Sequence, residues 1–397
     1  GKDRHAVLAG EMNGEPVWIV SQNQIAAASI SADELWPTNM TPWPSASTGL
    51  GLTGTNVVLG MWEVDGAVRE SHLEFQGRVV QMDQNATNPI PLNYHATGVA
   101  GTLAAGGASY FGSYYGYAMR GVAYQANVDA FDIKNLSSEL ADAAAGTTNE
   151  PGLRLSNHSW SLANGWRLQD EPVSNAWVWR GLYGFAEDPK FGAYTPSFDD
   201  GKGCEDIDEF LHANATRHLL VYSAGNDRLS GPGIATNYYM KSGTNWVHIT
   251  NPPANERDWR NGDGDTDGFD TMAAPGTAKN VLTVGSVLDV YHIIDSYAHL
   301  GYSTNSPMAL SGFSACGPTD DGRIKPDVVA VGERHPELRP FNLVTPDSDS
   351  DSDWQYQQGT SFAAPGVTAG LALPLQRRGQ LFPSLSAEVD DYRGSTL

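Results

Sequence analysis

The stretch Gly359-Thr-Ser-Phe-Ala-Ala-Pro-Gly-Val-Thr-Ala-Gly370 places a serine just before a run of small and apolar residues with helical character. Pro365 fits the first turn of a helix, where a missing N–H costs little. A serine at such a position lies beside unpaired backbone N–H groups and the positive end of the helix dipole. Ser361 is therefore either an N-cap, the usual role of a lone serine there, or a nucleophile whose attack creates an oxyanion.

Upstream of this stretch, short apolar runs alternate with segments of helical character. The expected strands are residues 57–62, 128–133, 153–155, 219–222, 281–284 and 328–330, and the expected helices are residues 94–105, 139–145 and 206–216. Near-continuous apolar strands are typical of a parallel sheet that is buried on both faces. The alternation predicts an α/β fold, a doubly wound and mostly parallel sheet with helices on both faces. In the helix after Ser361 we expect a kink or an early end at Pro374.

The composition is that of a globular, acidic chain. Hydrophobic residues make up 40 % of its 397 residues, and no uninterrupted apolar run approaches the length that spans a bilayer. The net charge is −22, from 24 basic and 46 acidic residues, so we expect neither nucleic acid nor a membrane surface as a partner. Such a charge suits a secreted enzyme, a saline habitat or cation binding. Cys204 and Cys316 could form one disulfide bridge, and the sequence leaves this open.

Three polar residues lie where an open parallel sheet binds its ligands, beyond the carboxyl ends of strands. Asp65 and Asn226 each follow a predicted strand, and His95 opens a predicted helix. Each alone is more often a turn, cap or structural residue. Together with Ser361 they supply the nucleophile, base, orienting acid and oxyanion donor that serine-based acyl transfer needs.

Four sequence blocks around these residues carry a resemblance. They are Trp62-Glu-Val-Asp-Gly66, His95-Ala-Thr-Gly-Val-Ala-Gly-Thr102, Tyr222-Ser-Ala-Gly-Asn226 and Gly359-Thr-Ser-Phe-Ala-Ala-Pro365. In this order they resemble the signature blocks of the subtilisin-like serine proteases, and the run 317–329 is similar to the segment that precedes the serine block there. The resemblance implies a subtilisin-like version of the predicted α/β fold.

The resemblance also implies a role for each residue. Ser361 Oγ would attack a peptide carbonyl, His95 would take its proton and later protonate the leaving amine, and Asp65 would orient the imidazole. The side-chain amide of Asn226 and the backbone N–H of Ser361 would hold the oxyanion. The chain is thus expected to be a secreted, monomeric serine endopeptidase that acts on proteins or peptides through an acyl-enzyme.

In this family the substrate binds as an added strand, and the resemblance extends to the residues beside that strand. Ser159, Trp160 and Ser161 would line one side of the pocket for the residue before the scissile bond, and Ala224 and Gly225 would line the other. Serine stands at 161 where relatives commonly have glycine, which would narrow the pocket. Trp160 is equally well explained as core packing.

An acidic loop is the candidate metal site. Asp263, Asp265, Asp267 and Gly268 have the Asp-x-Asp-x-Asp-Gly spacing of calcium loops. The twelfth position of such a loop is Ala274 rather than glutamate, which argues against an EF-hand. The loop is either a plain acidic turn or, as the resemblance implies for many relatives, a site for structural calcium.

The expected organisation is an N-terminal extension over residues 1–50, packed on a catalytic domain over residues 51–397. Surface insertions are expected near residues 162–202 and 228–278. The first segment is rich in Trp, Tyr, Gly and acidic residues, and the second holds the runs Asn251-Pro-Pro253 and Asn261-Gly-Asp-Gly-Asp-Thr-Asp-Gly268. The last helix looks incomplete, so we expect a domain that is cut short at its C-terminus.

Two other functions remain open. The chain could be a catalytically silent peptide-binding relative, since intact motifs do not prove a formed triad. It could also be a serine acyltransferase or peptide ligase that uses the same residues. One departure from the family pattern is Gly98, where relatives usually have a second histidine three residues after the catalytic one.

Overall fold

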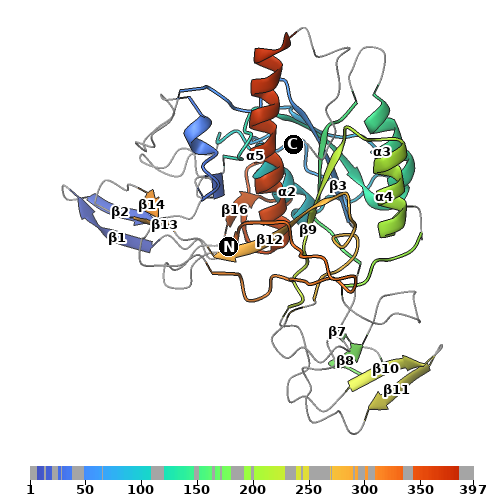
Figure 1. Cartoon of the computed structure of the whole chain (residues 1–397). Coiled ribbons are helices and arrows are strands. Elements are labelled where there is room, and N and C mark those ends of the chain that lie inside the picture. Colours follow the sequence, from blue (N-terminus) through green and yellow to red (C-terminus); the bar gives the residue numbers. More distant parts are fainter. Residues whose placement is uncertain are drawn as a thin grey trace.

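The computed structural model places a seven-stranded sheet at the centre of the described chain (Figure 1). In spatial order the strands are β15 (Val328–Glu333), β12 (Leu282–Leu288), β9 (Leu219–Ser223), β6 (Leu155–His158), β3 (Val58–Glu63), β5 (Asn127–Asp132) and β4 (Val79–Gln81). Every neighbouring pair is parallel. The predicted α/β fold with a parallel sheet is therefore confirmed.

The structure describes the greater part of the chain. The described residues are 7–12, 15–19, 26–27, 29–37, 49–64, 66–108, 120–146, 152–162, 166–169, 172–179, 192–197, 201–228, 238–242, 245–249, 269, 271–288, 291–293, 300–302, 309–333 and 343–383.

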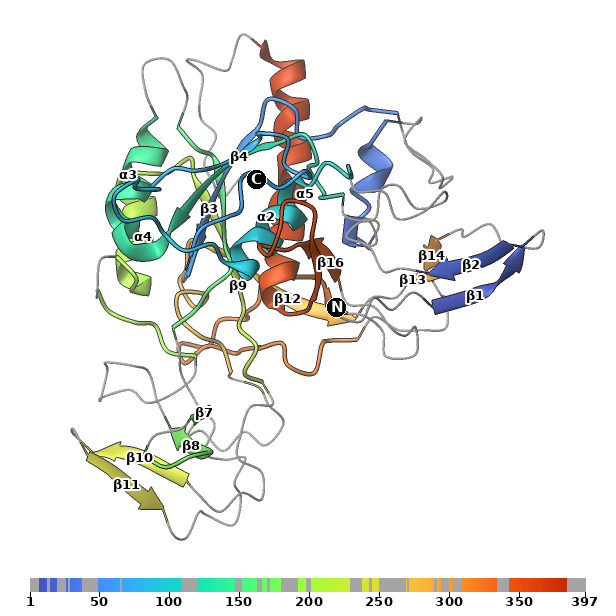
Figure 2. The same ribbon diagram turned by 180° about the vertical axis from the view of Figure 1, so that it is seen from behind.

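Helices cover both faces of the sheet, as the two opposite views show (Figures 1 and 2). Helices α2 (Tyr94–Ala104) and α5 (Thr360–Leu381) lie on one face, and α3 (Leu136–Ala145) and α4 (Cys204–Ala213) lie on the other. A hydrophobic cluster fills the space between sheet and helices on each face. A layer of hydrophobic core therefore packs against each face of the sheet.

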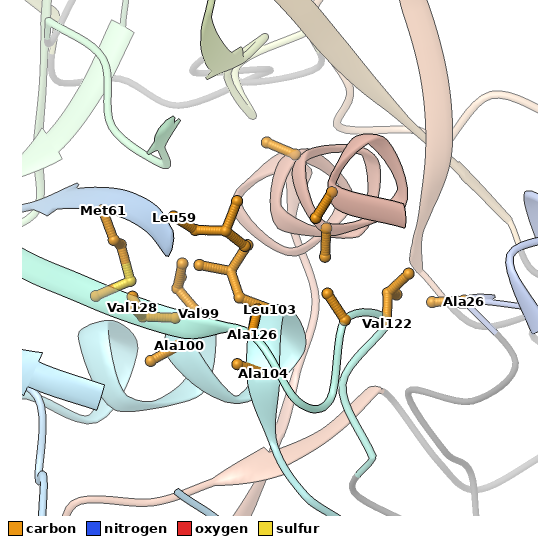
Figure 3. Close-up of a cluster of buried hydrophobic side chains, with 14 of the residues drawn as sticks. Ala26, Leu59, Met61, Val99, Ala100, Leu103, Ala104, Val122, Ala126 and Val128 are labelled. Atoms are coloured by element: carbon orange, nitrogen blue, oxygen red, sulfur yellow. The ribbon is translucent and has the colours of Figure 1, made fainter. Parts of the chain in front are cut away.

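The central strand β3 sends alternate side chains to the two faces, as the pleat of a strand requires. Leu59 and Met61 pack with Val99 and Leu103 of α2 (Figure 3). Trp62 points the other way and belongs to the cluster under α3 and α4. This alternation fixes which side chains of β3 can reach helix α2.

The helix that begins at Thr360 does not end early. Helix α5 continues through Pro374 to Leu381, so of the two alternatives predicted there, a kink or an early end, the early end is wrong. Pro374 is exposed on the solvent side of the helix. The carbonyl that loses its intrahelical partner can therefore bond water instead, which reduces the cost of the proline.

A hairpin of β16 (Leu343–Pro346) and β17 (Trp354–Gln357) lies directly against α2. A Cβ atom on Gly98 would come within 2.8 Å of Thr345 Oγ1, and one on Gly101 within 2.2 Å of Pro346 Cδ. The hairpin thus occupies the space that a histidine at position 98 would need.

The two predicted insertions meet in space. Strands β7 (Trp166–Gln169) and β8 (Ala176–Trp179) come from the first, and β10 (Tyr238–Ser242) and β11 (Asn245–Ile249) from the second. In the described part of the chain they form one sheet in the order β11-β10-β8-β7, and β8 pairs with β10 in parallel. Figures 1 and 2 both show this sheet apart from the central one.

The remaining elements are short. They are β1 (Val7–Met12), β2 (Glu15–Ile19), β13 (Tyr291–Ile293), β14 (Leu300–Tyr302) and the 3-10 turns at Asp33–Leu35 and Ile133–Asn135. Near the N-terminus, Ala27 and Trp36 are buried in the core cluster shared with α2 and α5. The Trp36 Nε1 atom donates to the carbonyl of Val122 at 3.1 Å. This part of the N-terminal segment therefore packs on the main body.

Candidate active site

Ser361 lies in the first turn of α5, and the residue at the N-cap is Gly359. Ser361 is therefore not the N-cap. The first turn of a helix has no intrahelical acceptors for its N–H groups, so the N–H of Ser361 is available to a ligand. The dipole of this long helix adds positive potential at the same place.

Asn226 lies beside this turn at the carboxyl end of β9. Its Oδ1 atom accepts hydrogen bonds from the backbone N of Thr360 at 2.9 Å and from Thr360 Oγ1 at 3.0 Å. These bonds fix the amide so that Nδ2 is left to donate. The Nδ2 atom would lie 3.4 Å from a Cβ on Gly359, which places the free donor at the start of α5.

Ser159, just beyond β6, is tied to the same turn by two hydrogen bonds. Ser159 Oγ donates to the carbonyl of Ser361 at 2.7 Å, and Ser361 Oγ donates to the carbonyl of Ser159 at 3.2 Å. Asn157 Nδ2 donates to Ser159 Oγ at 2.9 Å and supports it from within the strand. The segment predicted to bind substrate thus lies directly beside the candidate nucleophile.

His95 lies in the first turn of α2, where Asn93 caps the helix through bonds to the N–H groups of His95 and Ala96. The imidazole packs edge-on against the ring of Phe362, with centroids 5.5 Å apart. Because Phe362 follows Ser361 in the chain, this contact brings His95 to the first turn of α5. In the described chain the Ser361 hydroxyl bonds to Ser159 rather than to His95.

A buried carboxylate holds the other side of the His95 ring. His95 Nδ1 lies 2.9 Å from Glu63 Oε2, and the Glu63 side chain is only 1 % exposed. Burial by itself lowers the pKa of His95, but the charge and the hydrogen bond of Glu63 raise it, so that the pKa lies above its usual value. The arrangement therefore stabilises the protonated imidazole.

The orienting acid predicted from the motif, Asp65, lies outside the described residues. Glu63 was missed, although a signal for it is present in the sequence. It follows Leu59 and Met61 at intervals of two, and both of those residues face α2. In a strand, residues two apart share a face, so Glu63 is placed toward α2 as well.

The predicted pocket residues divide between the two faces of the sheet. Ser159 faces α5, whereas Trp160 is buried in the opposite cluster and packs edge-on against Tyr222 at 5.4 Å. This is the core-packing explanation of Trp160. Ala224 is buried against Met272 and Ala315. Ser161 and Gly225 adjoin these segments, with Ser161 half-buried and Gly225 buried.

The predicted metal ligands Asp263, Asp265 and Asp267 lie outside the described residues. Within the described residues no group of three or more histidine, cysteine or acidic side chains could hold a metal ion. Cys204 and Cys316 are both buried and unbridged. The described part also holds no helix with the length and hydropathy needed to cross a membrane.

Comparison with known proteins bears on this site. A family model described as the Subtilase family matches residues 54–389. Serine protease AprX from Bacillus subtilis (strain 168) is 25 % identical over 351 residues, which cover 86 % of this chain and 62 % of that protein. The chain thus spans less than two thirds of the length of this relative.

Among solved structures, the CspB protease of Clostridium perfringens superposes with a TM-score of 0.52 at 17 % identity, covering 89 % of each chain. That likeness supports the fold. Sphericase gives a TM-score of 0.45 at 18 % identity. The family model covers most of the chain and includes His95, Asn226 and Ser361, and the chain therefore belongs to the Subtilase family.

Proposed function

We propose that this protein is a serine endopeptidase in which Ser361 is the nucleophile, His95 the general base and Asn226 an oxyanion donor. The observation that carries the proposal is the convergence of all three on the first turn of α5. His95 reaches it through Phe362, and Asn226 through its two bonds with Thr360. A structural serine, histidine and asparagine from three separate elements have no packing reason to meet at one helix start.

The chemistry follows from these positions. Ser361 Oγ attacks the carbonyl carbon of a peptide bond while His95 Nε2 takes the hydroxyl proton. The same proton is then given to the leaving amine, and an ester on Ser361 remains. Water attacks this acyl-enzyme in the second half of the reaction, again with His95 as the base.

The oxyanion that forms in each step needs donors that are already in place. The Nδ2 group of Asn226 and the backbone N–H of Ser361 supply them at the positive end of α5. Thr360 holds the amide oxygen of Asn226, so the donor needs no reorganisation when the charge develops. This arrangement favours the transition state over the bound substrate.

Substrate would add as a strand beside residues 159–161, where the chain leaves β6 next to Ser361. The Ser361 hydroxyl donates to the Ser159 carbonyl in the free enzyme at 3.2 Å. That bond is longer than the usual O–H···O distance and is therefore weak. A peptide bound along this segment would compete for the Ser159 carbonyl and release the hydroxyl.

Three further properties belong to the proposal. Structural calcium would bind Asp263, Asp265 and Asp267, whose carboxylate oxygens are the hard donors that calcium prefers. No step of peptide hydrolysis passes through this ion. The acidic composition supports secretion, and we expect the enzyme to act as a monomer.

The test is labelling with a fluorophosphonate followed by peptide mapping, run beside cleavage of unfolded casein. The matched variants are Ser361→Ala and Ser138→Ala. Ser138 is an exposed serine of α3, on the opposite face of the sheet, so its loss controls for the substitution itself. We expect one adduct on Ser361 in the wild type and in Ser138→Ala, and none in Ser361→Ala.

Each result decides between the functions that the sequence left open. An adduct with casein cleavage that is lost in Ser361→Ala supports the endopeptidase. A folded wild-type protein without an adduct would overturn it in favour of a peptide-binding relative. Products that join to an added amine, rather than to water, would point to a peptide ligase.

A further inference from the structure

Glu63 is the last residue of β3, and its direction is set by the strand. Leu59 and Met61 pack against α2, and Glu63 continues the same alternation. Trp62, one residue earlier, faces the opposite cluster. The carboxylate of Glu63 is therefore delivered to the face that carries His95.

The distance between the end of β3 and the start of α2 is fixed by a second set of contacts. The N–H of Ala67 donates to the carbonyl of Pro91 at 2.7 Å, and the N–H of Asn93 donates to the carbonyl of Ala67 at 2.9 Å. Gly66 packs so closely that a Cβ atom would lie 2.5 Å from the Pro91 carbonyl oxygen. The chain after Glu63 is thus pinned to the residues before His95.

Within this frame the Glu63 carboxylate has one strong partner. Its Oε2 atom lies 2.9 Å from His95 Nδ1, and its buried Oε1 atom has no hydrogen-bond partner among the described residues. A buried carboxylate is costly unless an opposite charge compensates it. The imidazolium of His95 is the group in contact that can supply this charge.

We propose that Glu63, rather than the aspartate of the Glu-Val-Asp-Gly motif, is the positioning residue that orients His95 and stabilises its protonated form. The inference rests on the proposed endopeptidase activity and names the acid of that same site. During acylation the proton of Ser361 moves to His95 Nε2, while the Nδ1 proton stays on the ring and Glu63 stays ionised. No proton passes to the carboxylate.

His95 Nδ1 carries one hydrogen and so offers one strong donor, which Glu63 already accepts. An acid at position 65 would have to displace Glu63 to take the same role. Among the described residues, other acidic groups near His95 are few: the first turn of α5 has none, and the hairpin β16–β17 carries its acidic residues at positions 347–353 in its turn. Among described residues, Glu63 supplies the charge that raises the pKa of His95.

The experiment compares Glu63→Gln with Asp65→Asn and with Glu63→Asp. Glutamine keeps the shape and an acceptor oxygen but loses the charge, so a merely structural hydrogen bond would survive it. Glu209→Gln is the matched control, because Glu209 is exposed on α4, beneath the opposite face of the sheet. The readouts are kcat/KM for a peptide substrate against pH, and the rate of the Ser361 adduct.

We expect Glu63→Gln to lower kcat by about 10⁴-fold, the loss seen in serine triads that lose their carboxylate. Its acid limb of kcat/KM should move to lower pH, because the charge that favours the imidazolium is gone. Asp65→Asn should lower kcat far less and should shift the acid limb of kcat/KM less. Glu63→Asp should recover part of the lost rate, since it restores a carboxylate one methylene too short.

The reverse order, with Asp65→Asn causing the larger loss and the larger shift, would overturn the inference. Should Glu63→Gln fail to fold by near-UV circular dichroism, His95 can be titrated by NMR in the Ser361→Ala protein. The pKa of His95 should lie above its usual value and stay there when Asp65→Asn is added. A fall in this pKa would refute the proposed role of Glu63. A wild type without a Ser361 adduct would refute the endopeptidase alone, because the NMR titration does not need activity.

Discussion

Replacing Gly101 by alanine tests how the hairpin β16–β17 holds helix α2. The Cβ atom of the new residue would lie 2.2 Å from Cδ and 2.8 Å from Cγ of Pro346. Carbon atoms in contact prefer about 3.5–4.0 Å, so the hairpin and the helix must separate by about 1.3 Å or more. The proline ring cannot rotate away, and the cost therefore falls on the packing between two elements.

The size of the effect follows from two opposing terms. Overpacking a filled core costs typically about 1–3 kcal/mol. Alanine is a better helix former than glycine by about 0.8–1.0 kcal/mol, which offsets part of that cost. Because a 2.2 Å contact with a proline ring is severe, the upper part of the overpacking range applies, about 2–3 kcal/mol. After the helix-propensity gain is subtracted, we expect the Gly101→Ala protein to be about 1–2 kcal/mol less stable than its parent.

The assay is unfolding by urea, followed by tryptophan fluorescence, in a Ser361→Ala background that prevents self-digestion. Gly379→Ala is the matched control: it changes an exposed glycine of α5 where a Cβ atom would meet nothing within 4 Å. That variant should gain up to about 1 kcal/mol from helix propensity alone. Equal urea midpoints for the two variants would show that the hairpin does not press on α2 as described.

Three other predictions concern catalysis, pH and metal. Asn226→Ala should lower kcat by about 10²–10³-fold with little change in KM, measured by steady-state kinetics, because the oxyanion donor acts in the transition state. Burial lowers the pKa of His158, and that of His218 to about 3, so the unfolded chain binds more protons than the folded one at acidic pH. The contribution of these two histidines to the free energy of unfolding should therefore fall as the pH drops below 6.5, and urea midpoints at pH 5 and pH 7, compared between the wild type and His218→Asn, check this. Addition of a chelator should lower the thermal midpoint of the wild type, but not that of Asp265→Asn, if the acidic loop binds calcium.

The fold could be predicted because its signals are local. Apolar runs mark the strands, and small-residue helical patterns mark α2 and the start of α5. Boundaries were off by only a few residues, as for the strand expected at 57–62 and found at Val58–Glu63. Pro374 shows the limit of the rule that proline ends a helix. The energetic cost of the proline depends on whether the carbonyl that loses its hydrogen bond faces solvent, and packing decides this.

Contacts between distant segments could not be read from the chain. Two insertions were predicted separately, but nothing in either indicates that Tyr238 would pair with Trp177. Gly98 looked like a simple departure from a family pattern. Its reason lies about 250 residues away, where Thr345 and Gln355 fill the space that a side chain would need.

The motif and the alternation of the strand point to different acids for the site. Asp65 was predicted because it follows the expected strand and lies in the block Trp62-Glu-Val-Asp-Gly66. In a strand, alternate residues face the same side of the sheet. Glu63 therefore faces the same side as the buried Met61, and it still belongs to β3. This alternation has a physical cause, because the pleat of the strand sends successive side chains to opposite faces and so decides which of them reach α2. Glu63 is the last residue of β3, so it is the last residue whose side-chain direction is set by the sheet. This is the residue that forms the hydrogen bond with His95.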